Sequence, residues 1–411
     1  MFGTSFRKMT FLCLTAALTL SGVGACSQGQ SAERSEKKTG GELTVWVDAG
    51  HIDAIKTAAT SFTKKTGVDV KLVQKDFGSL QQDLITQVPA GKGPDISIGP
   101  DDWTGLLAAD GVIQTIELGA SEAKYEKVAV DAFKYEGKTY GVPYSIENVA
   151  LIRNKKLAPE APKDWADMKA MGKAAGTEYP YLVQVGDKGD PYTLYPVQTS
   201  FGSFVFGQND DGSYNPSQLT IGDQHGTDFA NWMKQETEEG LLSTSMSADI
   251  AISKFTEGAS PFIISGPWNI QAIQKAEMDF AVEPVPSAGG MPARPFVGVQ
   301  GFFLTAKTQN KIAATNFLTN YIGTKDIQVD LFKAGGNPPA LKDALAEVAS
   351  DPIVQGFAEA GKNGVPLPNI TEMSAVWESW NSAEVAIVNK QGEAQEIWAK
   401  MADDIAKTLK K

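Results

Sequence analysis

Polar and aromatic side chains follow two of the predicted strands. Asp48 and His51 come after the first predicted strand of the chain, and Asp102 and Trp103 come after the third. In open α/β sheets, ligands collect beyond the carboxyl ends of the strands. Carboxylates accept hydrogen bonds from hydroxyl groups, and flat rings cover apolar surface with little loss of side-chain freedom. These residue types together predict a cleft that binds a sugar.

Ordinary structural roles stay open for the residues after the third strand. Asp101 or Asp102 could cap the helix expected over 102–111, because aspartate is a favoured N-cap residue. Trp103 could belong to the core or to the cleft. The sequence alone supports both interpretations.

Three further segments place aromatic residues where they could reach the same cleft. Trp268 follows the Gly-Pro pair that ends an apolar run, an unusual place for a ring that normally belongs in a core. Trp377 and Trp380 share one face of a predicted helix, with a buried pair as the alternative. The prolines of "GDPYTLYP" favour a loop or an interrupted helix. Its candidates are Asp190, Tyr192 and Tyr195, with ordinary packing as the alternative for the tyrosines.

From residue 42 onward the chain alternates between β-rich and helical patterns. Apolar residues recur at helical spacing after His51, and Gly67 is a plausible helix stop. Each connection is long enough for parallel strands, so the sequence predicts an α/β fold with a doubly wound layer. The expected order is strand 42–48, helix 51–67, strand 68–75, helix 78–88, strand 95–99 and helix 102–111.

Two long extended segments, 138–155 and 294–308, divide the chain into thirds. If both cross between the same two sheets, the protein has two lobes joined by hinge segments, each lobe a sheet flanked by helices. Near the C-terminus, a helical stretch has apolar residues at steps of four, which indicates a core-facing stripe. The stripe consists of Ile397, Met401, Ile405 and Leu409.

The first residues carry a targeting pattern. Arg7 and Lys8 precede an apolar run over 10–20, which is too short to span a bilayer as a helix. The following "VGAC" resembles the lipobox of bacterial lipoproteins, in which cleavage precedes the cysteine and the thiol carries a lipid. Ordinary secretion is the alternative.

We therefore expect a signal peptide over 1–25 and a lipid on Cys26. Residues 26–41 are polar without periodicity, which is typical of a flexible tether. Its reach is on the order of 20 Å. The folded part would then stay at the extracellular face of the bacterial cell membrane.

Composition excludes several classes of site. A formal net charge of −12 argues against binding to nucleic acid, and 42% hydrophobic with 21% charged residues is typical of a globular chain. Cys13 leaves with the predicted signal peptide, so Cys26 alone cannot form an intramolecular disulfide or a cysteine zinc site. His51 and His225 are too few for a histidine-rich metal site. We expect a monomer with no metal and no cofactor.

Five segments occur in this order: "GPDISI", "YGVPYSIENVALIRNKKL", "ISGPWNI", "RPFVGVQGF" and "LPNITEMSAVW". As a set they resemble the maltose/maltodextrin-binding protein family, the extracellular solute-binding subunits of carbohydrate ABC importers, over about residues 42–411. The resemblance implies a two-lobed fold of the periplasmic-binding-protein type that closes on a sugar and delivers it to membrane permease subunits. The expected N-terminal lobe is 42–145 plus 302–347, and the expected C-terminal lobe is 149–297 plus 353–411.

The resemblance also implies roles for single residues. Trp268 and Trp377 match family tryptophans that stack on sugar, so a strand end at the hinge side can direct the Trp268 ring into the cleft. The other matching positions are Asp48, His51, Asp102 with Trp103 beside it, Glu147, Asp190 and Tyr192.

Three positions depart from the maltodextrin binders of enteric type. His51 replaces a lysine, Gly99 replaces a tryptophan, and Asn381 replaces an arginine one helical turn after Trp377. We therefore include Asn381 in the expected site and expect different subsites. The expected ligand is a malto-oligosaccharide or a related sugar, such as a longer α-glucan, a cyclodextrin or trehalose.

Other functions need different residues. A glycoside hydrolase needs two carboxylates about 5–10 Å apart, which Glu147, Asp102 and Asp190 could supply, but the chain has no hydrolase signature. We therefore expect a binding protein rather than an enzyme. An amino-acid receptor needs an arginine clamp, and only Arg153 and Arg294 lie near the crossovers. A polyamine receptor would suit the acids and the rings.

Overall fold

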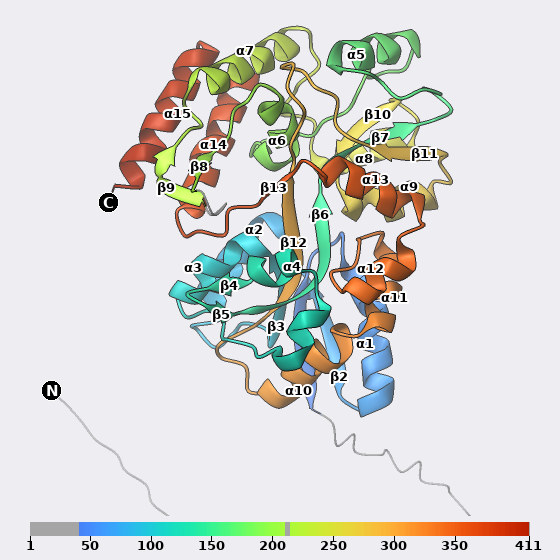
Figure 1. Ribbon diagram of the computed structural model, residues 1–411, viewed down its shortest axis with the longest axis vertical. Helices are drawn as coiled ribbons and strands as arrows, with labels where there is room; N and C mark the ends of the chain where they lie inside the picture. Colours follow the sequence, from blue (N-terminus) through green and yellow to red (C-terminus); the bar gives the residue numbers. More distant parts are fainter. Residues whose placement is uncertain (1–40, 210–213, 411) are drawn as a thin grey trace, which may run out of the picture. The chain divides into compact units, whose positions relative to one another are not determined.

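The structure, a computed structural model, describes residues 41–209 and 214–410 (Figure 1). The predicted signal peptide over 1–25, Cys26 with its expected lipid, and the predicted tether up to residue 40 lie outside the described residues. Among the helices of the described ranges, none combines the length and the apolar character needed to cross a membrane.

The first sheet contains the parallel strands predicted from the start of the chain. Its strand order is β13-β12-β3-β1-β2, and β6 also pairs with β12. β1 runs parallel to β2 and β3, which confirms the predicted crossovers, whereas β12 runs antiparallel to β3 and β6. The strands are β1 (Glu42–Val47), β2 (Asp69–Gln74), β3 (Ile96–Pro100), β6 (Gly141–Asn148), β12 (Phe296–Leu304) and β13 (Val365–Pro366).

Helices flank this sheet. α1 (Ile52–Thr66) ends as predicted at Gly67, which has a φ of 74° and donates its N–H to the carbonyl oxygen of Thr63. The other regular helices are α2 (Phe77–Gln87), α3 (Thr104–Ala109), α4 (Lys127–Ala132), α10 (Lys311–Phe317), α11 (Lys325–Gly335) and α12 (Lys342–Val348). Shorter elements are the hairpin β4 (Lys134–Tyr135) and β5 (Lys138–Thr139), two 3-10 turns (Asp101–Trp103, Gly119–Lys124) and a π-helical turn (Leu318–Ile322).

The second sheet is antiparallel. β7 (Ala150–Asn154) lies between β10 (Phe262–Ser265) and β11 (Phe280–Glu283). The surrounding helices are α5 (Trp165–Ala174), α6 (Pro191–Ser200), α7 (Gln224–Glu238), α8 (Ala248–Thr256), α9 (Ile270–Lys275), α13 (Pro352–Gly361), α14 (Met373–Val388) and α15 (Ala394–Thr408). A hairpin of β8 (Phe206–Gln208) and β9 (Tyr214–Leu219) and a 3-10 turn (Pro267–Asn269) complete this part.

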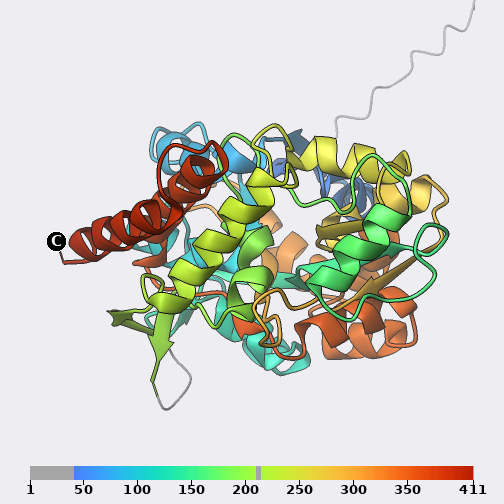
Figure 2. The same ribbon diagram turned by 90° about the horizontal axis from the view of Figure 1, so that it is seen from above.

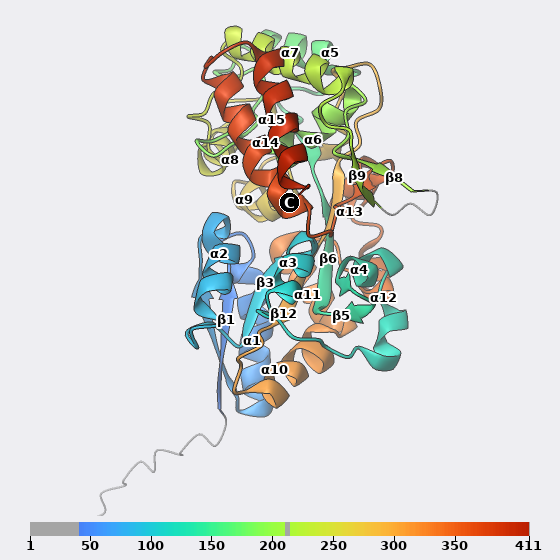
Figure 3. The same cartoon turned by 90° about the vertical axis from the view of Figure 1, so that its left-hand side faces the viewer.

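The chain crosses between two lobes through extended segments, as predicted. β6 pairs in the first sheet and ends at Asn148, and β7 begins two residues later in the second sheet. Along β12, Phe296 packs in the core around the second sheet, whereas Phe302 packs in the core around the first. Figure 3 shows the two lobes, with β1, β3 and α10 in one and α5, α7 and α15 in the other. The predicted two-lobed α/β fold is therefore confirmed.

The C-terminal helices complete the second lobe. Figure 2 shows α15, in dark red, lying close to α7, in yellow-green, and the two helices are in contact. On the predicted apolar stripe, Met401 and Ile405 are buried in the core of the second lobe. Ile397 and Leu409 are partly buried and pack against that core. Trp398, which lies outside that stripe, is fully buried.

The segment with two prolines is a continuous helix rather than a loop. Pro191 occupies the first turn of α6, where a missing N–H costs nothing, and the Asp190 carboxylate caps it by accepting the Thr193 N–H at 2.9 Å. Pro196 lies inside the helix, and Tyr195 beside it is 1% exposed. Because nearly every side chain of α6 is buried, packing holds the helix together despite the lost hydrogen bond.

Candidate functional site

A buried polar network joins the ends of β1 and β6. His51 Nδ1 lies 2.8 Å from each carboxylate oxygen of Asp48, and His51 Nε2 lies 3.6 Å from Glu147 Oε1. Asp48 Oδ1 also accepts the Gly50 N–H at 2.8 Å. The structure thus brings together three of the predicted site residues.

The network holds a positive charge on the imidazole. Burial alone would lower the pKa of His51, but the Asp48 and Glu147 carboxylates outweigh it and raise that pKa to about 10. Burial opposes ionisation of Asp48 as well, yet His51 keeps the pKa of Asp48 below its usual range. His51 is therefore an imidazolium at neutral pH.

Two residues that the sequence did not single out complete this network. Glu147 Oε1 accepts hydrogen bonds from Ser145 Oγ at 2.7 Å and from Asn337 Nδ2 at 2.6 Å. Ser145 lies two residues before Glu147 on the same strand, so the period of a strand could have indicated it. Asn337 comes from the segment after α11 and has no local sequence pattern that marks it.

The acids after β3 do not cap the following helix. Neither the turn Asp101–Trp103 nor α3 has a side-chain cap, so the N-cap prediction is wrong. Asp101 Oδ1 instead accepts the N–H of Val299 on β12 at 2.8 Å. Burial, together with the Asp102 carboxylate, raises the pKa of Asp101 well above its usual range.

Asp102 connects the two lobes. Its Oδ2 accepts the indole N–H of Trp377, on α14, at 3.0 Å. Burial raises the pKa of Asp102 to about 7, and this hydrogen bond opposes the rise only in part. Its Oδ1 is buried and has no hydrogen-bond partner within 41–209 and 214–410. Asp102 therefore keeps one buried carboxyl oxygen that no other group of the described ranges satisfies.

Trp377 is half-buried and presents a supported ring. Its indole stacks on Trp380 with ring centroids 5.5 Å apart and 6° between the planes. The rings of Trp377 and Phe296 meet edge to face, with their centroids 6.1 Å apart. Trp380 is fully buried, so its alternative assignment to the core is correct. The support fixes the orientation of the Trp377 ring, which is what a stacking surface requires.

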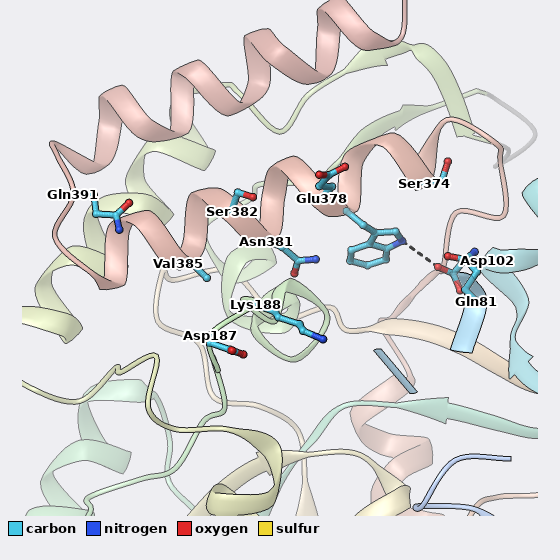
Figure 4. A pocket seen from close by; sticks show the side chains of 11 residues that line it. Gln81, Asp102, Asp187, Lys188, Ser374, Glu378, Asn381, Ser382, Val385 and Gln391 are labelled. Atoms are coloured by element: carbon cyan, nitrogen blue, oxygen red, sulfur yellow. Dashed lines mark hydrogen bonds between the residues drawn. The ribbon is translucent and has the colours of Figure 1, made fainter. Parts of the chain in front are cut away.

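A pocket of about 650 Å³ lies between the lobes at this point. α14 lines it along several turns, and Figure 4 shows Asp102 and Gln81 beside the end of this helix that carries Ser374. Predicted residues in its wall are Asp102, Trp377 and Asn381. Residues that sequence analysis missed are Gln81, Asp187, Lys188, Ser374, Glu378, Ser382, Val385 and Gln391.

The polar residues of α14 follow helical spacing from Ser374 through Glu378 to Ser382. That spacing was a usable indication of one polar face. Gln81 and Lys188, which lie on elements far apart in the sequence, had no such indication.

The structure explains the unusual position of Trp268 after the Gly-Pro pair. It lies in the turn Pro267–Asn269 directly after β10 and is half-buried, with its ring 6.2 Å from that of Tyr192. A Cβ at Gly266 would lie 2.1 Å from the Trp268 ring, so a glycine is required there. A Cβ at Gly50 of the first lobe would lie 3.5 Å from the Cβ of Trp268. The strand end thus places this ring at the junction of the lobes rather than inside one core.

Asp190 is engaged in local structure. Its two carboxylate oxygens accept hydrogen bonds from Gln184 and Thr193, and its own N–H donates to Glu384 Oε2 at 3.0 Å. Burial, followed by the repulsion of Asp190, raises the pKa of Glu384 well above its usual range. Asp190 thereby positions the start of α6 and, two residues later, Tyr192.

Trp103 and the arginines near the crossovers, Arg153 and Arg294, make structural contacts of their own. Trp103 is 7% exposed and packs in the core of the first lobe. Arg153 donates to both carboxylate oxygens of Glu283, and Arg294 lies over the ring of Phe204. Neither arginine is positioned as a clamp for an α-carboxylate. Within the described ranges, no three His, Cys, Asp or Glu residues converge on a metal site.

Known proteins with similar sequences are binding proteins. The chain is 27% identical over 425 residues to the galactooligosaccharide-binding protein of Bacillus subtilis, covering 98% of this chain and 97% of that protein. It is 29% identical over 406 residues to a maltooligosaccharide ABC transporter solute-binding lipoprotein of Streptococcus pneumoniae, covering 95% of each.

A solved structure has the same fold. The Thermus thermophilus maltotriose binding protein, bound with maltotriose, superposes with a TM-score of 0.83 at 31% sequence identity, covering 89% of this chain and 99% of that one. The family model for bacterial extracellular solute-binding proteins matches residues 57–356. Because that match spans most of the chain and the two-lobed fold agrees with it, the chain belongs to the family of bacterial extracellular solute-binding proteins.

Proposed function

We propose that this protein captures a malto-oligosaccharide or a related oligosaccharide between its lobes and delivers it to the permease subunits of an ABC importer. The observation that carries the proposal is the pocket of about 650 Å³ that both lobes line, with the Trp377 ring and the Asp102 carboxyl group in its wall. The names of the relatives, which bind galacto- and malto-oligosaccharides, support the ligand class.

The residues of the wall suit a neutral polyhydroxylated ligand. The Trp377 ring offers an apolar face to a sugar ring, and its support by Trp380 means that little side-chain freedom is lost on binding. The Asp102 carboxyl group lies in the wall with one oxygen unpartnered in the described ranges, and the side chains of Gln81 and Asn381 can both donate and accept. A ligand that touches both lobes favours the closed arrangement by as much as its affinity differs between closed and open forms.

Further parts of the proposal concern the ends and boundaries of the chain. We assign a signal peptide to 1–25, a lipid anchor to Cys26 and a tether to 26–41, which would hold the receptor, as a monomer, at the extracellular face of the cell membrane. The name of the pneumococcal relative as a lipoprotein supports the anchor.

We assign 42–145 plus 302–347 to the N-terminal lobe and 149–297 plus 353–411 to the C-terminal lobe. The apolar core clusters support this division, because the cluster around the first sheet and those around the second draw largely on different parts of the chain. Val354 is an exception, since it falls in the C-terminal range but packs in the cluster of the first sheet.

The remaining predicted residues supply the rest of the proposed site. Trp268 and Tyr192 form a second aromatic group at the lobe junction, and the network of Asp48, His51 and Glu147 supplies fixed charges. We place Asn381 in the pocket wall, one helical turn after Trp377. Asp190 belongs to the proposed site through its support of Tyr192, and Trp103 through its support of the wall behind Asp102.

A thermal-shift panel tests this function. A ligand that binds only the native state at about 100 times its Kd stabilises the protein by about 2.7 kcal/mol. We expect malto-oligosaccharides to raise the melting temperature, and amino acids and polyamines to leave it unchanged. A rise with a polyamine and with no sugar would overturn the proposal. Chromatography after prolonged incubation with malto-oligosaccharides should recover them intact, and shortened products would indicate a hydrolase.

A further inference from the structure

Phe77, the first residue of α2, has an unusually exposed ring. The residue is 46% exposed, whereas the other aromatic residues (Phe, Tyr and Trp) of the described ranges are buried or half-buried. The ring is not loose, because it stacks on Trp103 with centroids 5.4 Å apart and 30° between the planes. One face of Phe77 is therefore held from behind while the other remains accessible.

The base of this stack is built into the sheet. A Cβ at Gly99, on β3, would lie 2.7 Å from the Trp103 ring and 2.9 Å from that of Phe303. Only a glycine at position 99 leaves room for the Trp103 ring to pack against β3, and Trp103 is 7% exposed. Trp103 thus provides a rigid floor, and Phe77 provides the surface that solvent can reach.

The stack lies beside the pocket between the lobes. Gln81 lines the pocket and follows Phe77 by four residues on α2, so the two side chains share a face of the helix. Asp102, which also lines the pocket, directly precedes Trp103. A Cβ at Gly78 would lie 3.3 Å from Nζ of Lys188, which lines the pocket from the second lobe.

Two charged or polar groups accompany the ring at this side. Figure 4 shows Lys188 extending from the second lobe into the space below α14, and Gln81 beside Asp102 on the first-lobe side. An ammonium group and a carboxamide can hydrogen-bond the hydroxyl groups at the edge of a sugar ring whose apolar face lies on Phe77. Such an arrangement suits a sugar unit with free hydroxyl groups at its edge.

We propose that Phe77 forms an accessory subsite that binds an additional sugar unit of an oligosaccharide already held at Trp377. This inference rests on the proposed function and adds to it a preference for chains longer than the pocket alone accommodates. The Phe77 ring is the stacking surface, Trp103 and Gly99 position it, and Gln81 with Lys188 contact the hydroxyl groups.

Calorimetry with a chain-length series from maltose to maltopentaose tests the subsite. We expect the affinity of the wild-type protein to rise with chain length. Phe77→Ala should lower the affinity for the longest bound sugars roughly 10-fold and leave the shortest bound sugar unchanged, because only the longer chains reach the ring. Phe77→Trp should retain the preference for length, whereas Phe77→Leu, which keeps apolar bulk but not a flat face, should lose it.

Ile250→Ala is the matched control, since Ile250 is 44% exposed but lies on α8. It should behave as the wild type at every chain length, and melting temperatures of all variants should show that each is folded. Unchanged affinities in Phe77→Ala, or an equal loss at every length, would overturn the subsite while leaving the receptor function standing. Absence of binding by the wild-type protein to every sugar in the series would overturn both.

Discussion

Substitution of Trp377 separates the two contributions that its indole makes. Trp377→Phe keeps a flat ring on Trp380 but removes the N–H that donates to Asp102 Oδ2 at 3.0 Å. Since Asp102 Oδ1 already lacks a partner in the described ranges, the buried carboxyl group would lose its contact with α14. Trp377→Ala removes the hydrogen bond and the stacking surface together.

The magnitudes follow from these contacts. Leaving a buried acceptor without its partner costs about 1–3 kcal/mol, so Trp377→Phe should lower the free energy of unfolding by an amount in that range. Truncation of a buried aromatic anchor at a binding site costs about 2 kcal/mol or more, which is roughly a 30-fold rise in Kd. We therefore expect Trp377→Ala to weaken sugar binding about 30-fold and Trp377→Phe to weaken it far less.

Titration calorimetry and denaturant unfolding of a double-mutant cycle provide the assay. The cycle combines Trp377→Phe with Asp102→Ala, which removes the oxygen that accepts the indole N–H, and groups in direct contact show coupling energies of about 0.5–3 kcal/mol. Additive changes in stability would contradict the hydrogen bond between the lobes. A Kd for Trp377→Ala within about twofold of the wild type would remove the ring from the site, provided that its melting curve shows a folded protein.

Three other changes test separate parts of the site. Gly266→Ala puts a Cβ at 2.1 Å from the Trp268 ring, so the ring must move, and calorimetry should show a Kd raised roughly 10-fold; an unchanged Kd would contradict a role for that ring. The pKa of His51 rises from 6.5 to about 10 on folding, so its stabilisation is complete below about pH 6.5 and is lost as the pH rises through about 10. Urea unfolding should show that loss in the wild type but not in His51→Gln, which should itself be less stable near pH 7 by about 3–5 kcal/mol because two carboxylates lose their buried partner. Burial raises the pKa of Glu384, so the wild type binds a proton there that the unfolded chain releases, and stability falls as the pH rises above the ordinary glutamate range. Glu384→Gln removes this loss and should be the more stable protein near pH 8 but not near pH 4; parallel pH profiles for the two would refute the assignment.

The fold was predictable where its determinants are local. The run that ends at Gly67 gave the length and the end of α1, because periodic apolar residues and a left-handed glycine act within a few residues of each other. The interior proline of α6 led to the prediction of a loop or an interrupted helix. The helix is continuous because the burial of its side chains, a tertiary effect, outweighs one lost hydrogen bond. The same limit applies to Trp398, whose burial depends on contacts between α15 and α7 rather than on the spacing of α15 alone.

The candidate site was predictable in part for the same reason. Trp377 and Asn381 could be predicted from the sequence because they lie on one helix face in a segment with a family pattern. Capping by Asp101 or Asp102 was one interpretation because a cap is local, whereas the actual partner of Asp101 is the N–H of Val299, far along the chain. Asn337 reaches the network only when distant segments of the first lobe pack together, and Lys188 reaches the pocket only when the two lobes meet, so no spacing in the sequence marks either residue.

An experimental structure of this protein with a malto-oligosaccharide is the most direct test of the proposed sugar site between the lobes. We predict density for sugar units between the lobes, with one pyranose face against the Trp377 indole and a hydroxyl group within hydrogen-bonding distance of the Asp102 carboxyl group. A sugar bound on the outer surface of one lobe, with Trp377 and Asp102 untouched, would contradict the proposed receptor site.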